Sequence, residues 1–106
     1  MPVYLWQASY QAEGTKGLMK EGGSKRRQYV QQLVEKSGGK LLAFYFAFGE
    51  IDAVGLTEFP DHATALSHSL AVNASGAVRL RTTPLLTPEE VDAAAKKTIA
   101  YRPPGA

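Results

Sequence analysis

Two arginines on one predicted strand form the pattern in this sequence best suited to holding an anion. Arg79 and Arg81 stand two residues apart in a segment of β-forming residues, so both side chains project from one strand face. Two guanidinium groups at this spacing could clamp a carboxylate or a phosphate. The alternative is a solvated edge, or an ion pair with Asp52 or Glu58 of a neighbour. Charged and apolar residues often alternate at sheet edges, which favours this alternative.

Asp52, the last residue of Gly49-Glu50-Ile51-Asp52, is a second candidate. A buried carboxylate there could act as an acid or base, which makes Asp52, together with Tyr45, a candidate catalytic residue. A carboxylate that fixes a hairpin or an interface is the favoured interpretation. Glu58 falls on the same strand face, but six residues separate the two carboxylates by about 20 Å. That separation excludes a paired-carboxylate site.

A basic run follows a glycine-rich stretch near the start of a predicted helix. Lys25, Arg26 and Arg27 come directly after Gly22-Gly23-Ser24, and free helix amides with three cations could hold an anion. The spacing is not that of a P-loop, and a solvated basic face is favoured. The formal net charge is only +2, and no aromatic residues are interleaved with the cations, so we expect no nucleic-acid partner.

The two histidines do not form a predicted metal site. His62 and His68 are six residues apart on one predicted helix, which places them about 120° apart around its axis. A single histidine entering a cavity could ligate heme iron, but an exposed helix histidine is favoured. The chain has no cysteine, which excludes disulfides, thiolate nucleophiles and sulfur-ligated zinc. We expect neither a metal nor a cofactor.

Aromatic residues cluster in the predicted strands and could line an apolar cavity between sheets, although packing is their commoner use. They are Tyr4, Trp6, Tyr10, Phe44, Tyr45, Phe46 and Phe48. If the domain binds a ligand, we expect a mostly apolar compound that carries a carboxylate or similar anion. Its contacts would be Trp6, Phe44 and Tyr45, with Arg79 and Arg81 on the anion.

The elements that must position these residues alternate along the chain. Strands are predicted over residues 3–10, 41–48, 51–59 and 78–86, with Gly49-Glu50 as a two-residue hairpin turn. Helices are predicted after the N-caps Ser24, Asp61 and Thr87, the last running to about residue 98. Four glycines in residues 11–23 predict an irregular segment with at most a short helical turn over 16–20. Apolar stripes predict the packed helix faces, which for the second helix are Ala63, Leu66, Leu70 and Ala74.

This order, β-α-β-β-α-β with an extra C-terminal helix, predicts an α+β, ferredoxin-like fold with a four-stranded antiparallel sheet. Residues 1–100 are expected to form one domain and 101–106 a flexible tail. Residues 41–48 are apolar on both faces, with residues 42, 44, 46 and 48 on one face and 41, 43, 45 and 47 on the other. The helices cover only one face of such a sheet. We therefore expect a homodimer or higher homo-oligomer that pairs through the open face.

Length and composition agree with a cytoplasmic domain. The 106 residues are 44% hydrophobic and 21% charged, which is typical of a compact fold that needs no membrane. No window approaches the roughly 20 apolar residues of a membrane span, and the first residues lack a secretion-signal pattern.

Several short motifs resemble those of the GYD-domain family, from Tyr4 to about Lys97. The family's signature is usually Gly-Glu-Tyr-Asp, and Ile51 stands where the tyrosine is expected. The resemblance implies a ferredoxin-like subunit of the dimeric α+β barrel type, in which two sheets face each other. The motifs are Gly38-Gly39-Lys40-Leu41, Phe44-Tyr45, residues 49–54, Phe59-Pro60-Asp61, and Arg81-Thr82-Thr83 before Thr87-Pro88-Glu89-Glu90.

Two classes of function follow from these observations. The first is an oligomeric domain that binds a small apolar or anionic ligand between sheets, or that serves as an accessory or assembly protein. The alternative is a small dimeric-barrel enzyme, a cofactor-independent oxygenase, isomerase or lyase, which rests on analogy of fold. No Ser-His-Asp or Gly-x-Ser-x-Gly arrangement supports nucleophilic catalysis.

Overall fold

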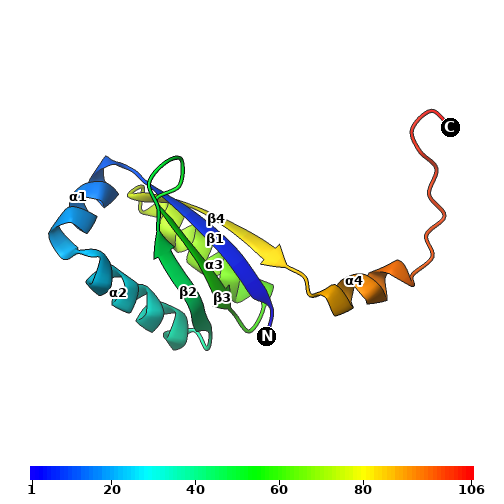
Figure 1. The fold of residues 1–106 in the computed structure, drawn as a ribbon, viewed down its shortest axis with the longest axis horizontal. Helices are drawn as coiled ribbons and strands as arrows, with labels where there is room; N and C mark the ends of the chain where they lie inside the picture. The colour runs from blue at the N-terminus through cyan, green and yellow to red at the C-terminus, as the bar shows by residue number, and fades with distance from the viewer.

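A computed structural model describes residues 1–106 as four strands and four helices (Figure 1). The elements in chain order are β1 (Val3–Tyr10), α1 (Ala12–Glu21), α2 (Gly23–Lys36), β2 (Lys40–Phe46), β3 (Ala53–Glu58), α3 (His62–Ala74), β4 (Val78–Leu85) and α4 (Pro88–Ala95). The strands form one antiparallel sheet in the order β2-β3-β1-β4. The predicted ferredoxin-like fold is therefore confirmed.

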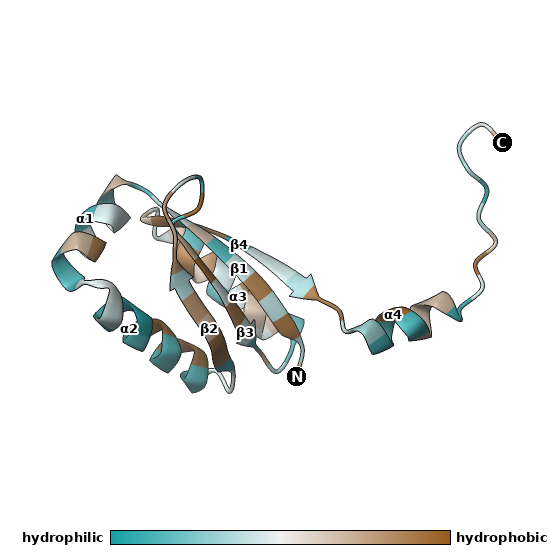
Figure 2. Cartoon of the chain, in the orientation of Figure 1, coloured by the Kyte–Doolittle hydropathy of each residue, from teal (hydrophilic) through white to brown (hydrophobic).

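The core lies between the sheet and the helices α2 and α3. Tyr4, Val34, Phe59 and Ala65 form one buried cluster under both helices. Ala8, Ala53 and Val78 form a second cluster toward the other end of the sheet. Figure 2 shows hydrophobic residues along β2 and β3, whereas α2 is largely hydrophilic on its outer side. Only 9 of the 106 residues are buried, so the two clusters make a thin core.

The segment before α2 is more regular than its glycines suggest. Residues 12–21 form the complete helix α1, so the prediction of an irregular segment with a short turn is wrong. Ser24 is not an N-cap, because α2 begins one residue earlier and Gly22 occupies the cap position without a side-chain bond. Gly22 adopts a φ of 88°, a conformation that glycine reaches without steric cost. That conformation lets α1 end and α2 begin at one residue.

The β2–β3 connection also differs from the prediction. Residues 47–52 form a loop between Phe46 and Ala53, so Gly49-Glu50 is not a two-residue turn between strands that reach 48 and 51. A β-bulge at Leu42 shifts the pairing between Leu41 and Ala43. Leu41 pairs with Thr57 and therefore lies on the face that the helices cover, whereas Ala43 lies on the opposite face. Period-two counting had no means of detecting this extra residue.

Helix α3 turns a different stripe toward the sheet from the one predicted. Asp61 caps it as expected and accepts a hydrogen bond from the Thr64 amide at 2.8 Å. Ala65 is buried, whereas Leu66 and Leu70 are 57% and 61% exposed. The small side chain at position 65 lets the helix approach the rings of Tyr4 on β1 and of Phe59, just after β3, which larger leucines would prevent. The predicted packed stripe is wrong, and it lies on the outer face of the helix.

Helix α4 follows β4 and projects away from the body of the domain (Figure 1). Thr87 and Glu90 form the predicted capping box, with Pro88 in the first turn. The helix ends at Ala95, three residues before the predicted end. Pro84 lies on β4, which is an edge strand as its proline predicts. None of the helices is long and apolar enough to cross a membrane.

Candidate functional site

The open face of the sheet carries a row of apolar side chains beside a row that ends at a charged residue on β4. Ala43, Leu56 and Leu5 are successive partners across three strands. Since side chains alternate between faces and Thr57 is buried under the helices, this row faces away from them. The adjacent row of partners on the same face is Tyr45, Val54, Gln7 and Arg81.

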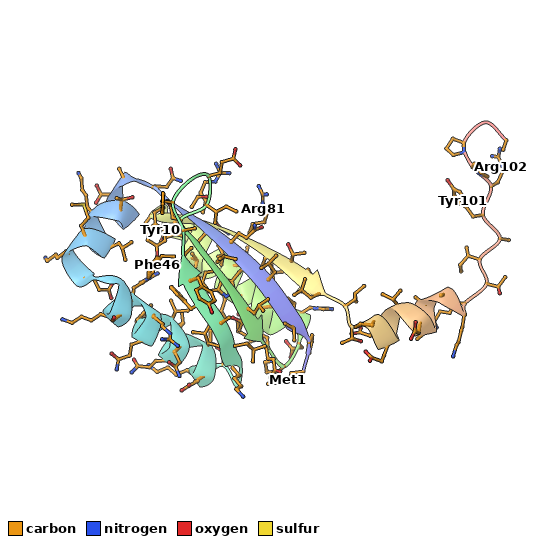
Figure 3. All side chains as sticks on the ribbon, viewed as in Figure 1. Met1, Tyr10, Phe46, Arg81, Tyr101 and Arg102 are labelled. Carbon is orange, nitrogen blue, oxygen red and sulfur yellow. The ribbon has the colours of Figure 1, made fainter.

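Arg79 and Arg81 lie together on this open face, at the edge of the sheet. Their partners on β1 are Ser9 and Gln7, which place amide and hydroxyl groups beside the guanidinium groups. Figure 3 shows Arg81 at the same end of the sheet as Tyr10. Both arginines are exposed. The prediction that the two share one face is confirmed.

A groove of about 810 Å³ runs beside the two arginines. The β2–β3 loop forms one wall through Glu50 and Ile51. The Ser9 hydroxyl donates to the Glu50 carbonyl at 3.0 Å and so ties this loop to β1. A typical small-ligand site has a volume of about 300–1,000 Å³, so the groove has the size of a ligand site. Gln7, Ser9, Asn73, Arg79, Leu80 and Arg81 complete its lining.

Asp52 fixes the loop to the end of β1. Its carboxylate accepts a hydrogen bond from the Tyr10 amide at 2.7 Å. Its own amide donates to the Ala8 carbonyl at 2.8 Å, and its carbonyl accepts from the Ala47 amide at 2.8 Å. These bonds agree with the structural interpretation of Asp52 and place the Gly49–Asp52 motif over the groove. In this arrangement the Asp52 carboxylate does not line the groove beside the two arginines.

Trp6 and Phe44 lie on the opposite face of the sheet from Arg79 and Arg81. Their rings are 5.2 Å apart between centroids, and the Trp6 indole donates to the Thr57 hydroxyl at 2.9 Å. Both rings line a small cavity of about 80 Å³ between the sheet and the helices. An engineered cavity of about 150 Å³ holds benzene, so this space is too small for a ligand with an anionic group. The structure therefore separates the predicted aromatic contacts from the predicted anion clamp.

Tyr45 is the predicted aromatic contact that does lie on the open face. Its side chain is 69% exposed, and its strand partner is Val54. Phe48 belongs to the β2–β3 loop and is fully exposed. Figure 3 shows Phe46 on β2, facing the α2 side of the sheet. An apolar ligand on the open face would thus meet Tyr45 and aliphatic residues, and not Trp6 or Phe44.

The basic run at the start of α2 does not converge on one point. Arg26 is half-buried, lines the internal cavity and lies 5.1 Å from the ring centre of Tyr29. Lys25 and Arg27 are turned away from the cavity, and Lys25 is exposed. Burial raises the pKa of the Tyr10 phenol, and the nearby Arg26 opposes that rise. The basic run is therefore a helix surface from which one arginine points inward, and it does not form an anion site.

The two histidines each serve the packing of α3. The Tyr4 hydroxyl is hydrogen-bonded to Nδ1 of His62 at 2.5 Å. His68 is half-buried, packs 4.8 Å from the Phe59 ring and is hydrogen-bonded to the Ser37 hydroxyl at 2.7 Å. The expectation of exposed histidines is confirmed for His62 and wrong for His68. His68 faces the sheet because the packed stripe of α3 runs through it.

We expect His68 to make stability fall on mild acidification. Burial lowers the pKa of His68 below its ordinary value of 6.5, so the unfolded chain binds this proton at higher pH than the folded chain. Stability is then complete above about pH 6.5 and declines as the pH falls toward the folded-state pKa. Melting curves at about pH 7.5 and about pH 5.5 should show a smaller decrease for His68→Asn than for the wild type. An equal decrease in both proteins would rule out this role of His68.

Asn73 is a structural residue whose role could not be predicted from the sequence. Its side-chain oxygen accepts from the Leu80 amide at 2.7 Å, and its nitrogen donates to the Leu80 carbonyl at 3.0 Å. The side chain thus occupies the position of a further strand beside the free edge of β4. It holds α3 against the strand that carries Arg79 and Arg81. The only sequence signal was an amide residue near the end of a helix.

The residues around the groove do not assemble a metal centre. No group of three His, Asp or Glu side chains comes close enough to hold a metal ion. The polar side chains around the groove are two guanidinium groups, two amides, one hydroxyl and the Glu50 carboxylate. All of them except the carboxylate can donate hydrogen bonds to a carboxylate, sulfonate or phosphate.

Comparison with known families gives one match. The model of the GYD domain family matches residues 4–95, which is most of the chain. No curated protein and no solved structure matches the sequence.

Proposed function

The chain belongs to the GYD-domain family, and on this premise we propose that it is a homo-oligomeric domain that binds a small apolar anion on the open sheet face. In the proposed assembly, the sheets of two copies face each other. The ligand lies between them, with its anionic group on Arg79 and Arg81.

The pairing of Arg79 and Arg81 beside a groove is the observation that carries this proposal. Two charge-assisted contacts contribute about 1.5–3 kcal/mol each when they are shielded from water. The facing sheet of a second copy would supply that shielding. Leu5, Val54 and Leu56 are half-buried on the same face and would contact the apolar part of the ligand.

Binding is better supported than the enzyme alternative. Asp52, one of the two candidate acid–base residues, already accepts the Tyr10 amide and holds the loop. Tyr45, the other, is an exposed phenol on β2 with no hydrogen bond to a second polar side chain that would activate it. Binding through the two arginines and the apolar face therefore needs no acid or base.

The test is the binding of two fluorescent probes, the anionic anilinonaphthalene sulfonate and the neutral Nile red. Arg79→Ala and Arg81→Ala should each weaken the affinity for the sulfonate about tenfold or more, since about 1.4 kcal/mol corresponds to a factor of ten. Neither substitution should change the affinity for Nile red. Arg27→Ala, an exposed arginine on α2, is the matched control and should change neither. Unchanged sulfonate affinity in both β4 variants would dispose of the arginine clamp.

A further inference from the structure

The chain exposes more surface than is expected for a compact folded monomer of its mass. Its accessible surface is 7758 Å², whereas a folded monomer of 11.4 kDa exposes about 5,800 Å². The radius of gyration is 17.1 Å, compared with about 13 Å for a compact domain of this length. The excess of about 2,000 Å² per chain matches what each partner buries in an obligate dimer. The shape thus indicates a chain that associates with a second copy.

Much of this excess belongs to residues 86–106, here named the C-terminal arm, which extends from the body (Figure 1). On α4, Val91, Ala94 and Ala95 recur at helical spacing and form an apolar stripe. None of the residues of α4 is buried, and Val91 is 55% exposed. Ile99, after the helix, is 79% exposed. The arm therefore carries an apolar surface that its own chain leaves in solvent.

A matching surface lies on the outer side of α3. Leu66 and Leu70 stand one turn apart and are both more than half exposed. Beside them is a groove of about 330 Å³ between α3 and β4, here named the α3–β4 groove. It is lined by Tyr4, His62, Ala63, Ala65, Leu66, Ser69, Thr82 and Pro84. Helix α3 contains no Asp, Glu, Lys or Arg, so nothing on it repels the acidic first turn of α4.

The connection between β4 and α4 directs the arm away from this groove in its own chain (Figure 1). β4 ends at Leu85, and Thr87 is already fixed as the cap of α4, which leaves only Leu86 as a free link. Pro88 restricts Thr87 to extended backbone, and Thr87 has a ψ of 157°. Of the two residues between the elements, Thr87 is thus held in one backbone conformation, so a reversal of chain direction would have to be made at Leu86 alone. The arm of one chain therefore reaches a second chain more readily than its own body.

We propose that two copies of this chain exchange their C-terminal arms, so that α4 of each packs on Leu66 and Leu70 beside the α3–β4 groove of the other. The alanines of α4 leave room for the two leucines, and Val91 contacts the groove. This inference does not rest on the proposed function, because α3 covers the face of the sheet opposite to Arg79 and Arg81.

Disulfide trapping tests the exchange, and the absence of native cysteine removes background reaction. Chains carrying Leu66→Cys and chains carrying Val91→Cys, distinguished by a mass tag, are mixed, refolded together and mildly oxidised. The expected product is a mixed disulfide dimer. The matched control pairs Val91→Cys with Tyr29→Cys, an exposed position on α2, and should give no such dimer.

Two results would overturn the exchange. One is a mixed dimer that forms no more readily from Leu66→Cys than from the Tyr29→Cys control. The other is a disulfide that closes within one chain of the Leu66→Cys/Val91→Cys double variant, which would mean that the arm folds back on its own body. Val91→Asp gives a readout without cysteine: it should weaken self-association, whereas Tyr29→Asp on α2 should not.

Discussion

Replacing Gly55 with valine is expected to destabilise the domain by about 2–4 kcal/mol. This is a large part of the free energy of unfolding of a natural domain, which is about 5–15 kcal/mol. A Cβ atom at position 55 would lie 2.2 Å from the Trp6 ring and 2.7 Å from the Ala43 carbonyl oxygen. The indole lies across the glycine and donates to Thr57, so it cannot move without losing that bond. The side chain of valine would therefore displace Trp6 or separate β3 from β2.

Urea denaturation measures this effect. The midpoint for Gly55→Val should fall well below that of the wild type. Gly17→Ala is the matched control, because a Cβ at position 17 meets nothing within 4 Å and the residue lies inside α1. Alanine there should raise stability by about 0.5–1 kcal/mol. A Gly55→Val midpoint equal to that of the wild type would contradict the placement of Trp6.

Replacing Tyr4 with alanine is expected to destabilise the domain by about 3–5 kcal/mol. Tyr4 is 2% exposed and lies in the larger core cluster, 5.8 Å from Phe59 and 5.7 Å from His62 between ring centres. Few other residues are buried, so the surrounding structure has little material with which to fill the cavity. Burial raises the pKa of the Tyr4 phenol, so the hydroxyl stays protonated beside His62 at neutral pH.

Tyr4→Phe separates the ring from the hydroxyl. It keeps the packing and removes only the hydrogen bond to His62, so we expect a loss of about 1 kcal/mol. Calorimetry or chemical denaturation of the two variants should therefore rank Tyr4→Ala as much the more damaging. Equal losses would mean that the hydrogen bond, and not the ring, holds α3 to the sheet.

Apart from α1, the order of the elements was predictable because its signals are local. Thr87 with Glu90, and Asp61 with Thr64, satisfy helix ends through residues only three positions apart. The packed face of α3 was not predictable from such signals. Its sequence carries two stripes of small or apolar residues, and the choice between them depends on the rings of Tyr4 and Phe59 on other elements.

The candidate site was likewise predictable where the signal is local and not where it depends on distant elements. Alternation along β4 correctly places Arg79 and Arg81 on one face, since period two needs no tertiary information. This alternation does not determine which side chains of β1 lie on the same sheet face as the two arginines. The register pairs Arg81 with Gln7 and Thr82 with Trp6, which sends Trp6 to the helices and Gln7 to the groove. The shared face is decided by the pairing between strands that are distant in sequence, and the sequence of one strand does not specify that pairing.

Sedimentation of the wild type and of Leu56→Lys tests the open-face assembly most directly. Leu56 lies at the centre of the open face, between Leu5 and Ala43. At micromolar concentration the wild type should sediment as a dimer or a larger oligomer. A lysine at position 56 should shift the protein to a smaller species, whereas Tyr29→Lys on α2 should not. A wild type that remains a stable monomer, or a Leu56→Lys protein that sediments as the wild type does, would contradict the pairing of open sheet faces.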